Sequence, residues 1–184
     1  MSAAEPAPLS VGACALDAAE LILRRGAAAP AALAPLPGLQ EARWDAKRLS
    51  VCVQPGRWLV LAAPGAPGAL AERCALECGS AALVLARGSG LRGLAVWGAR
   101  HRALLARGCR LDLEGAELAS GRAAATLMAQ TPVTAIAVPH AMLLLAPASL
   151  AAHLHEWLLL SARALGPARE RALTFQELIG ELSP

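Results

Sequence analysis

The sequence predicts an α+β fold, in which antiparallel strand pairs form a sheet and the helices pack on one of its faces. Two observations carry this prediction. Short apolar runs of strand length are bounded by Gly and Pro residues, and segments with helical spacing lie between them. From residue 57 onward the order reads strand, helix, two strands, helix, two strands, helix. Helices placed between antiparallel pairs are typical of α+β folds.

We expect three parts in a chain of 184 residues, a length that suits one domain with short extensions. Residues 1–43 are rich in Ala and Pro and are predicted to form an arm, with a helix around residues 16–26 that the following prolines end. Residues 44–166 are predicted to form the compact domain, and residues 167–184 a helical tail.

The elements of the compact domain follow from local patterns. Apolar runs predict strands at residues 57–63, 80–88, 90–98, 131–138 and 140–147. Helical spacing predicts helices at residues 67–79, 99–108 and 149–167. The glycine-rich turn at residues 87–90 is expected to join its two flanking strands as a hairpin.

The segment 104–113 is predicted to end a helix and to begin a buried strand. Gly108 is expected to leave the helix with a positive φ, and Cys109 to pack back on Leu104. Leu111 and Leu113 alternate with Asp112, a pattern that places one face of a strand in the core.

The last long helix and the tail supply the predicted partner interface. Ser149 is the expected N-cap of the helix, and Thr174 with Glu177 forms a capping-box pattern before a short second helix. Two leucines fall off the predicted core face of the long helix beside its tryptophan, and further large apolar side chains lie on the short helix, which indicates a covered surface. These interface residues are Trp157, Leu159, Leu160, Phe175 and Leu178.

Composition argues against nucleic-acid binding and against a membrane protein. The net charge is +3, and the arginines are scattered instead of forming a basic stripe. No Asp, Glu, Lys or Arg occurs in residues 123–155, but prolines divide that window into pieces of strand length, whereas a membrane-spanning helix needs about 20 apolar residues. The N-terminus lacks the basic start of a secretory signal, and five irregularly spaced cysteines do not resemble a disulfide framework. We therefore expect a cytoplasmic protein.

No arrangement of residues predicts catalysis or metal binding. Cys74 and Cys78 share a helix face, but neither their spacing nor that of His153 and His155 matches a zinc pattern. Cys109 has arginines beside it in sequence, yet its expected place at the helix end is buried.

The glycine-rich segment 88–93 precedes a strand and not a helix N-terminus, which is unlike a phosphate loop. The carboxylates of Asp112, Glu114 and Glu117 follow a helix and are expected in solvent. We therefore predict no catalytic, cofactor-binding or metal-binding residues in this chain.

Over residues 57–166 the chain resembles the gamma subunit of heterotetrameric sarcosine oxidase. The matching stretches are residues 57–61, 98–113, 121–133 and 149–158. The most specific part of the match consists of Gly108, Cys109, Leu111, Asp112 and Leu113, followed by Thr126 and Trp157. Arg107 replaces the usual Lys and Ala99 the usual Pro, departures that leave open which amine oxidase complex this is.

The resemblance implies an α+β fold similar to the folate-binding domain of the glycine-cleavage aminomethyltransferase. It also implies an accessory subunit that binds alpha, beta and delta subunits. The complex would demethylate sarcosine oxidatively to glycine, with FAD, FMN, NAD and tetrahydrofolate on the other subunits and no cofactor on this chain. An aminomethyltransferase-like folate-binding domain that acts alone is the alternative, and its pterin ring would need a carboxylate such as Asp112, Glu114 or Glu117. A module that binds an unrelated partner is a third possibility.

Overall fold

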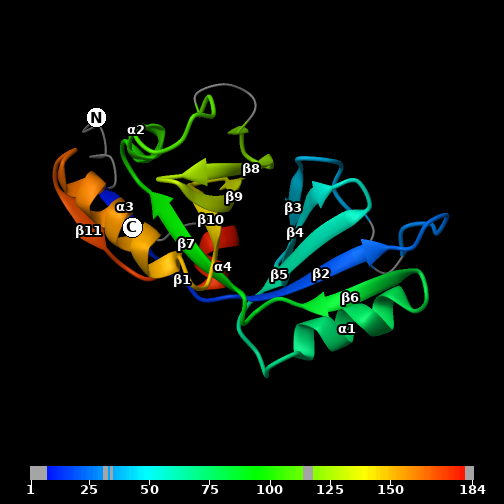
Figure 1. The fold of residues 1–184 in the computed structure, drawn as a ribbon. Helices are drawn as coiled ribbons and strands as arrows, with labels where there is room; N and C mark the ends of the chain where they lie inside the picture. The colour runs from blue at the N-terminus through cyan, green and yellow to red at the C-terminus, as the bar shows by residue number, and fades with distance from the viewer. Residues whose placement is uncertain (1–7, 31–32, 34, 114–117, 181–184) are drawn as a thin grey trace, which may run out of the picture.

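The fold is built from two mostly antiparallel sheets with a helix layer on the outside of each (Figure 1). The computed structural model describes residues 8–30, 33, 35–113 and 118–180. Its strands are β1 (Leu9–Cys14), β2 (Asp17–Leu23), β3 (Ala42–Trp44), β4 (Arg48–Gln54), β5 (Arg57–Ala62), β6 (Ala82–Ala86), β7 (Leu91–Trp97), β8 (Ala123–Met128), β9 (Thr131–Val138), β10 (Ala141–Pro147) and β11 (Ala168–Glu170). Its helices are α1 (Ala69–Cys78), α2 (His101–Ala106), α3 (Ala151–Arg163) and α4 (Phe175–Ile179). The predicted α+β class is confirmed.

Sheet A has the strand order β11-β1-β7-β10-β9-β8, and sheet B the order β3-β4-β5-β2-β6. Neighbouring strands run antiparallel except β1 and β11, which are parallel. The chain crosses between the sheets after β1 and again after β6, and in Figure 1 these crossings lie at the lower junction of the two sheets.

Three apolar clusters hold these layers together. The inner core lies between the sheets and includes Leu49 and Leu61 of sheet B with Ile136 and Leu143 of sheet A. The outer core of sheet A lies under α2 and α3, and the outer core of sheet B lies under α1.

Strand β10 shows why a run without charges forms a strand here. Leu143 and Leu145 face the inner core, whereas Met142 and Leu144 face the outer core of sheet A. A strand buried on both faces has no solvent-facing position for a polar side chain. Within the uncharged window at residues 123–155, β10 is therefore two-sided core, whereas Leu127 of β8 is 58% exposed.

The N-terminal prediction is wrong for residues 9–23. The expected helix around residues 16–26 is strand β2, and β1 lies inside sheet A, so this region is part of the compact fold and not an arm. In β2, Ala18 faces the inner core whereas Ala19 and Leu21 face the outer core of sheet B. An Ala and Leu run with helical propensity is held as a strand because both of its faces are buried.

Several other expectations are corrected. Strands β6 and β7 belong to different sheets, so the turn at residues 87–90 joins two layers and not a hairpin. Residues 111–113 form no strand, and the N-cap of α3 is Leu150 and not Ser149. Strands β3, β4 and β8 were not predicted, and neither was β11, which lies in the expected helical tail.

The tail is tied to sheet A before it reaches α4. The N–H of Arg171 donates to the Val11 carbonyl at 3.1 Å, and the N–H of Leu173 donates to the Ala13 carbonyl at 2.9 Å. Gly12 permits this approach, since a Cβ at Gly12 would lie 1.7 Å from the Arg171 carbonyl oxygen. The predicted capping box of Thr174 and Glu177 then begins α4 and is confirmed.

Candidate functional site

Gly108 lies against the indole ring of Trp157, where α2 meets α3. A Cβ at Gly108 would lie 2.5 Å from Cη2 of Trp157, closer than real Cβ contacts occur. The φ angle of Gly108 is not positive, so the predicted left-handed turn is wrong. The backbone N–H groups of both Gly108 and Cys109 instead donate to the Leu105 carbonyl. The position therefore requires glycine for close packing of the two helices.

Cys109 lies in the outer core of sheet A together with Leu104, so its predicted burial is confirmed. Its Sγ lies 3.5 Å from Oγ1 of Thr126 on β8, and the N–H of Leu111 donates to the same sulfur at 3.5 Å. Leu113 is buried, Leu111 is half-buried, and Asp112 is exposed. The segment 108–113 thus joins α2, α3 and β8.

Two arginines of this region bind backbone carbonyls. Arg102 of α2 donates to the carbonyl of Leu113 and, at 3.4 Å, to that of Leu118. Arg107 donates to the Ser161 carbonyl of α3 at 3.3 Å. A guanidinium group can bridge several carbonyls because its donors form a rigid fork. These arginines therefore hold segments of the chain together.

The predicted partner interface is only partly exposed. Trp157 and Leu159 are half-buried against the outer core of sheet A, and Leu160 is 58% exposed. Phe175 and Leu178 are 1% and 2% exposed, because α4 fills the inner core beside sheet A. For these two residues the interface prediction is wrong, because their side chains pack in the core of this same chain.

The thiols are buried, and burial raises the pKa of four of them. All five cysteines are free and buried. Burial raises the pKa of Cys14 to about 12, with the nearby Glu177 carboxylate adding to the shift, and burial raises the pKa of Cys74 to about 11. Burial also raises the pKa values of Cys52 and Cys78. Thiolate is the nucleophilic form, so these four side chains behave as core residues.

The cysteines and histidines that were considered as zinc ligands do not lie together in the fold. Cys74 and Cys78 pack in the outer core of sheet B, whereas His153 and His155 lie on α3 over sheet A. Within the described ranges, no group of three or more His, Cys, Asp or Glu side chains could hold a metal ion. Nε2 of His155 instead lies 3.7 Å from Oε1 of Glu170.

Glu20 is a buried carboxylate that the sequence analysis missed. It lies on β2, is 6% exposed, and pairs with Nη2 of Arg57 and, at 3.6 Å, with Nε of Arg87. Because a helix was predicted for residues 16–26, Glu20 was not recognised as an acidic residue at an inward-facing position of a strand. Its two arginine partners identify a structural ion-pair cluster.

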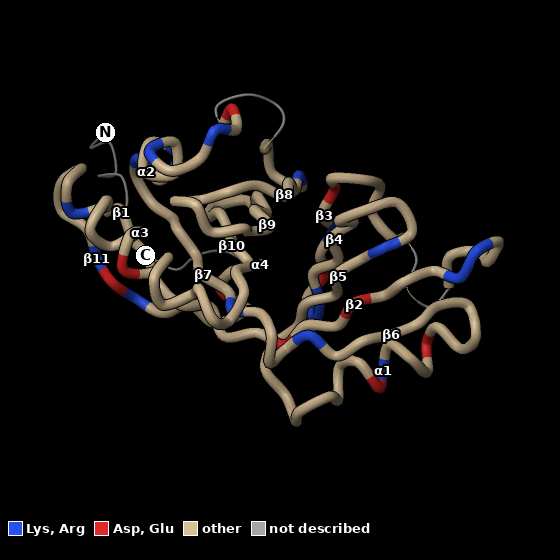
Figure 2. Tube along the Cα trace, in the orientation of Figure 1, with Lys and Arg blue, Asp and Glu red and all other residues tan. Residues whose placement is uncertain are grey.

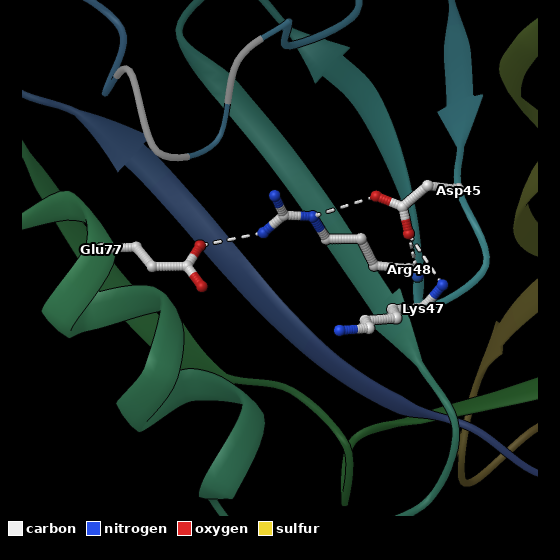
Figure 3. Close-up of polar contacts among 4 residues, drawn as sticks. All are labelled: Asp45, Lys47, Arg48 and Glu77. Atoms are coloured by element: carbon white, nitrogen blue, oxygen red, sulfur yellow. Dashed lines mark hydrogen bonds and ion pairs between the residues drawn. The ribbon is translucent and has the colours of Figure 1, made fainter.

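A second polar cluster links the β3–β4 turn to α1 (Figure 3). Nη1 of Arg48 lies 2.9 Å from Oε2 of Glu77, and Nε of Arg48 lies 3.8 Å from Oδ2 of Asp45. Oδ1 of Asp45 also accepts the N–H groups of Lys47 and Arg48. Partly exposed ion pairs of this kind contribute up to about 1 kcal/mol. Figure 2 shows other basic residues on many elements, as scattered in space as in the sequence.

Among the described residues, two of the cavities have room for a small ligand. One of about 400 Å³ is lined by Arg100 and Arg169 together with Leu165 and Pro167. The other, of about 440 Å³, lies at the crossing between the sheets and is lined by Asp17 and Ser89. Oδ1 of Asp17 accepts the N–H of Ala18 at 2.8 Å.

A pterin ring would need a carboxylate at a cavity, and Asp17 lines the cavity of about 440 Å³. Asp112 is exposed and lines neither large cavity. Glu114 and Glu117 lie outside the described residues.

The two-sheet α+β architecture is shared with solved structures of known proteins. A chain of heterotetrameric sarcosine oxidase from Corynebacterium sp. U-96, in complex with pyrrole 2-carboxylate, matches with a TM-score of 0.76 and 22% identity over 88% of this chain and 87% of that chain. Aminomethyltransferase T of the glycine cleavage system from Bartonella henselae matches with a TM-score of 0.63 and 17% identity over 89% of this chain and 48% of that chain.

At these identities the likeness shows the fold, and it confirms the predicted similarity to the aminomethyltransferase fold. This chain spans about half the length of that aminomethyltransferase. No protein-family model and no curated protein matches the sequence. No helix among the described residues is long and apolar enough to cross a membrane.

Proposed function

We propose that this chain is a non-catalytic, gamma-type subunit of a heterotetrameric sarcosine oxidase complex. The single observation that carries the proposal is the match of nearly the whole chain to nearly the whole of one chain from such a complex. A match of this extent supports a structural unit equivalent to that chain.

The segment 108–113 supports the same role. Its residues resemble the gamma-subunit pattern, and in this fold they join α2, α3 and β8 through the Gly108–Trp157 packing and the Cys109–Thr126 contact. Those contacts stabilise a scaffold and place no reactive group in a cavity. An accessory subunit needs such a scaffold, because it positions its partners without performing the chemistry.

The partners in this proposal are alpha, beta and delta subunits. FAD, FMN, NAD and tetrahydrofolate belong to those chains, where they carry the oxidation of sarcosine to glycine and the transfer of the one-carbon unit. This chain contributes binding surface and holds no cofactor. The proposed site of action is the cytoplasm, on the strength of the sequence alone.

The test is co-expression of this chain with the products of its neighbouring genes, followed by size-exclusion chromatography. We expect a complex that contains this chain, absorbs as a flavoprotein and produces peroxide when sarcosine is added. The isolated chain should have neither flavin absorbance nor activity. A chain that stays monomeric beside its neighbours and binds tetrahydrofolate would overturn the proposal.

The second candidate is a folate-binding domain that acts alone, and Asp17 is the observation that favours it. Its carboxylate lines the cavity of about 440 Å³ in a fold shared with an aminomethyltransferase. Isothermal titration of the isolated chain with tetrahydrofolate tests this candidate, and Asp17→Asn should then weaken binding. Glu72→Gln, a change on the exposed face of α1, is the matched control.

A further inference from the structure

Strand β6 is an edge strand whose outer side no described strand covers. It ends the order of sheet B, with β2 on one side only. The N–H of Arg87 donates to the Ala18 carbonyl, which turns that amide toward β2. Because amides alternate along an antiparallel strand, those of Ala82, Val84 and Ala86 face the uncovered side. The strand therefore presents a row of backbone donors and acceptors.

Two of the other sheet edges carry the usual protections against pairing, which are short length and charge, and the third, β8, is covered at its start. Strand β11 has three residues and includes Arg169 and Glu170, and β3 has three residues and includes Arg43. Strand β8 is tied at its start, where the N–H of Ala123 donates to the Gln40 carbonyl. Strand β6 has five residues, reads Ala-Leu-Val-Leu-Ala and carries no charge.

The face of β6 that points toward the inner core is apolar and exposed. Leu83 is 50% exposed and Leu85 is 38% exposed. Leu83 pairs with the half-buried Ile22 of β2, and Leu85 pairs with Glu20, so the exposed apolar surface ends at the ion-pair cluster of Glu20. Further along the same face, Leu59 and Leu61 are covered by the inner core. An exposed apolar face that adjoins an uncovered edge is typical of a binding surface.

Charges around this surface indicate the chemistry of what covers it. Arg57 and Arg87 lie beside it, and Arg24 follows β2 with its N–H donating to the Ala81 carbonyl at the start of β6. Glu20 pairs with both Arg57 and Arg87, but its single negative charge compensates only one of the three positive charges. A second copy of this chain would bring more uncompensated arginines to the same surface. A segment with carboxylates compensates them.

We propose that β6 binds an extended, apolar segment of a partner subunit that carries Asp or Glu at its ends, by addition of a strand to sheet B. Main-chain hydrogen bonds to Ala82, Val84 and Ala86 supply the pairing, and Leu83 and Leu85 receive the alternate apolar side chains. The carboxylates pair with Arg24 and with the arginines beside Glu20. The inference rests on the proposed function, which supplies the partner subunit.

The first test is hydrogen exchange on the co-expressed complex and on the isolated chain. We expect the amides of Ala82, Val84 and Ala86 to exchange at least tenfold more slowly in the complex, an estimate based on the protection that a paired strand gives. Protection confined to other surfaces overturns the inference. Concentration-dependent protection of the same three amides in the isolated chain also overturns it, because a second copy would then be the occupant.

The second test compares surface variants for assembly in the same co-expression. The double variant L83K/L85K should weaken association at least about tenfold, as a buried apolar anchor does when replaced. R24E should weaken it by a smaller factor and reduce its salt dependence. Leu76→Lys and Arg73→Glu, at exposed positions of α1, are the matched controls and should assemble normally.

The outcomes separate the two proposals. If L83K/L85K assembles normally into an active complex, the strand-addition inference is wrong, whereas the proposed function is not contradicted. Failure of every neighbouring chain to bind the unchanged protein sinks both. A crosslinker placed at Leu85 adds a chemical check, since a captured partner segment without Asp or Glu contradicts the proposed occupant.

Discussion

The Cα of Gly108 lies so close to the indole of Trp157 that no larger side chain fits between α2 and α3. A Cβ there would lie 2.5 Å from Cη2, 2.8 Å from Cζ2 and 3.1 Å from the Ala129 nitrogen. A ring and a backbone nitrogen both limit the space, so relief on one side is not enough. This contact explains why position 108 is occupied by glycine.

Gly108→Ala should destabilise the protein by about 1–3 kcal/mol, because the added methyl group overpacks a rigid contact. Urea unfolding followed by circular dichroism measures the change. Gly65→Ala is the control, since nothing lies within 4 Å of a Cβ at Gly65. Equal stabilities of the two variants would refute the packing argument, and Trp157→Leu should restore part of the loss in Gly108→Ala.

Gly12→Ala should disrupt the attachment of the tail to β1. The new Cβ would meet the Arg171 carbonyl oxygen at 1.7 Å, a contact with backbone that no side-chain rotation relieves. We expect destabilisation of at least about 3 kcal/mol, at the severe end for single substitutions. Limited proteolysis should then cut after residue 167 in the variant, and an intact tail would contradict this assignment.

Phe175→Ala should cost about 3–5 kcal/mol of unfolding free energy, as is usual for a buried aromatic residue. Phe175 is 1% exposed and packs in the inner core, so the effect appears in the isolated chain. Leu160→Ala, at a 58% exposed position, should stay within about 0.5 kcal/mol. Thermal unfolding of both variants distinguishes a core residue from a surface residue.

Glu20→Gln should destabilise the protein by about 1–3 kcal/mol, because a buried group loses its charge-assisted bonds to Arg57 and Arg87. Both arginines are at least 40% exposed, so water screens them and limits the cost. Glu72→Gln on the surface of α1 serves as the reference. A change no larger than that of the reference, measured by urea unfolding, would show that the cluster contributes nothing.

Stability should fall as the pH rises above about 9, the ordinary pKa of these thiols, toward 12. Burial raises the pKa of Cys14 to about 12 and that of Cys74 to about 11. In this window the unfolded chain releases protons that the folded chain keeps, and the slope of stability with pH is therefore negative. Cys14→Ala should flatten the decline in urea-unfolding midpoints between pH 9 and pH 10, whereas an unchanged slope would contradict the role of Cys14.

Local chemistry alone predicted the helices α1, α2 and α3, the capped α4, and the strands β5, β9 and β10. These elements carry their own signals, such as the Thr174–Glu177 capping box and the uncharged run of β10. The candidate segment 108–113 was also visible in the sequence, although its strand and its left-handed turn were wrong. Trp157 was identified as important without its contact to Gly108.

The sequence by itself determined the α+β class, the buried character of the thiols and the importance of the segment 108–113, because each depends on neighbours along the chain. Only the tertiary structure decided that β1 and β2 are strands, that β6 and β7 enter different sheets, and that Phe175 and Leu178 are core residues. The physical reason is that these assignments depend on pairing between distant segments. Burial on two faces overrides the local helical propensity of β2, and the tail reaches the inner core only because Gly12 lets Arg171 approach β1.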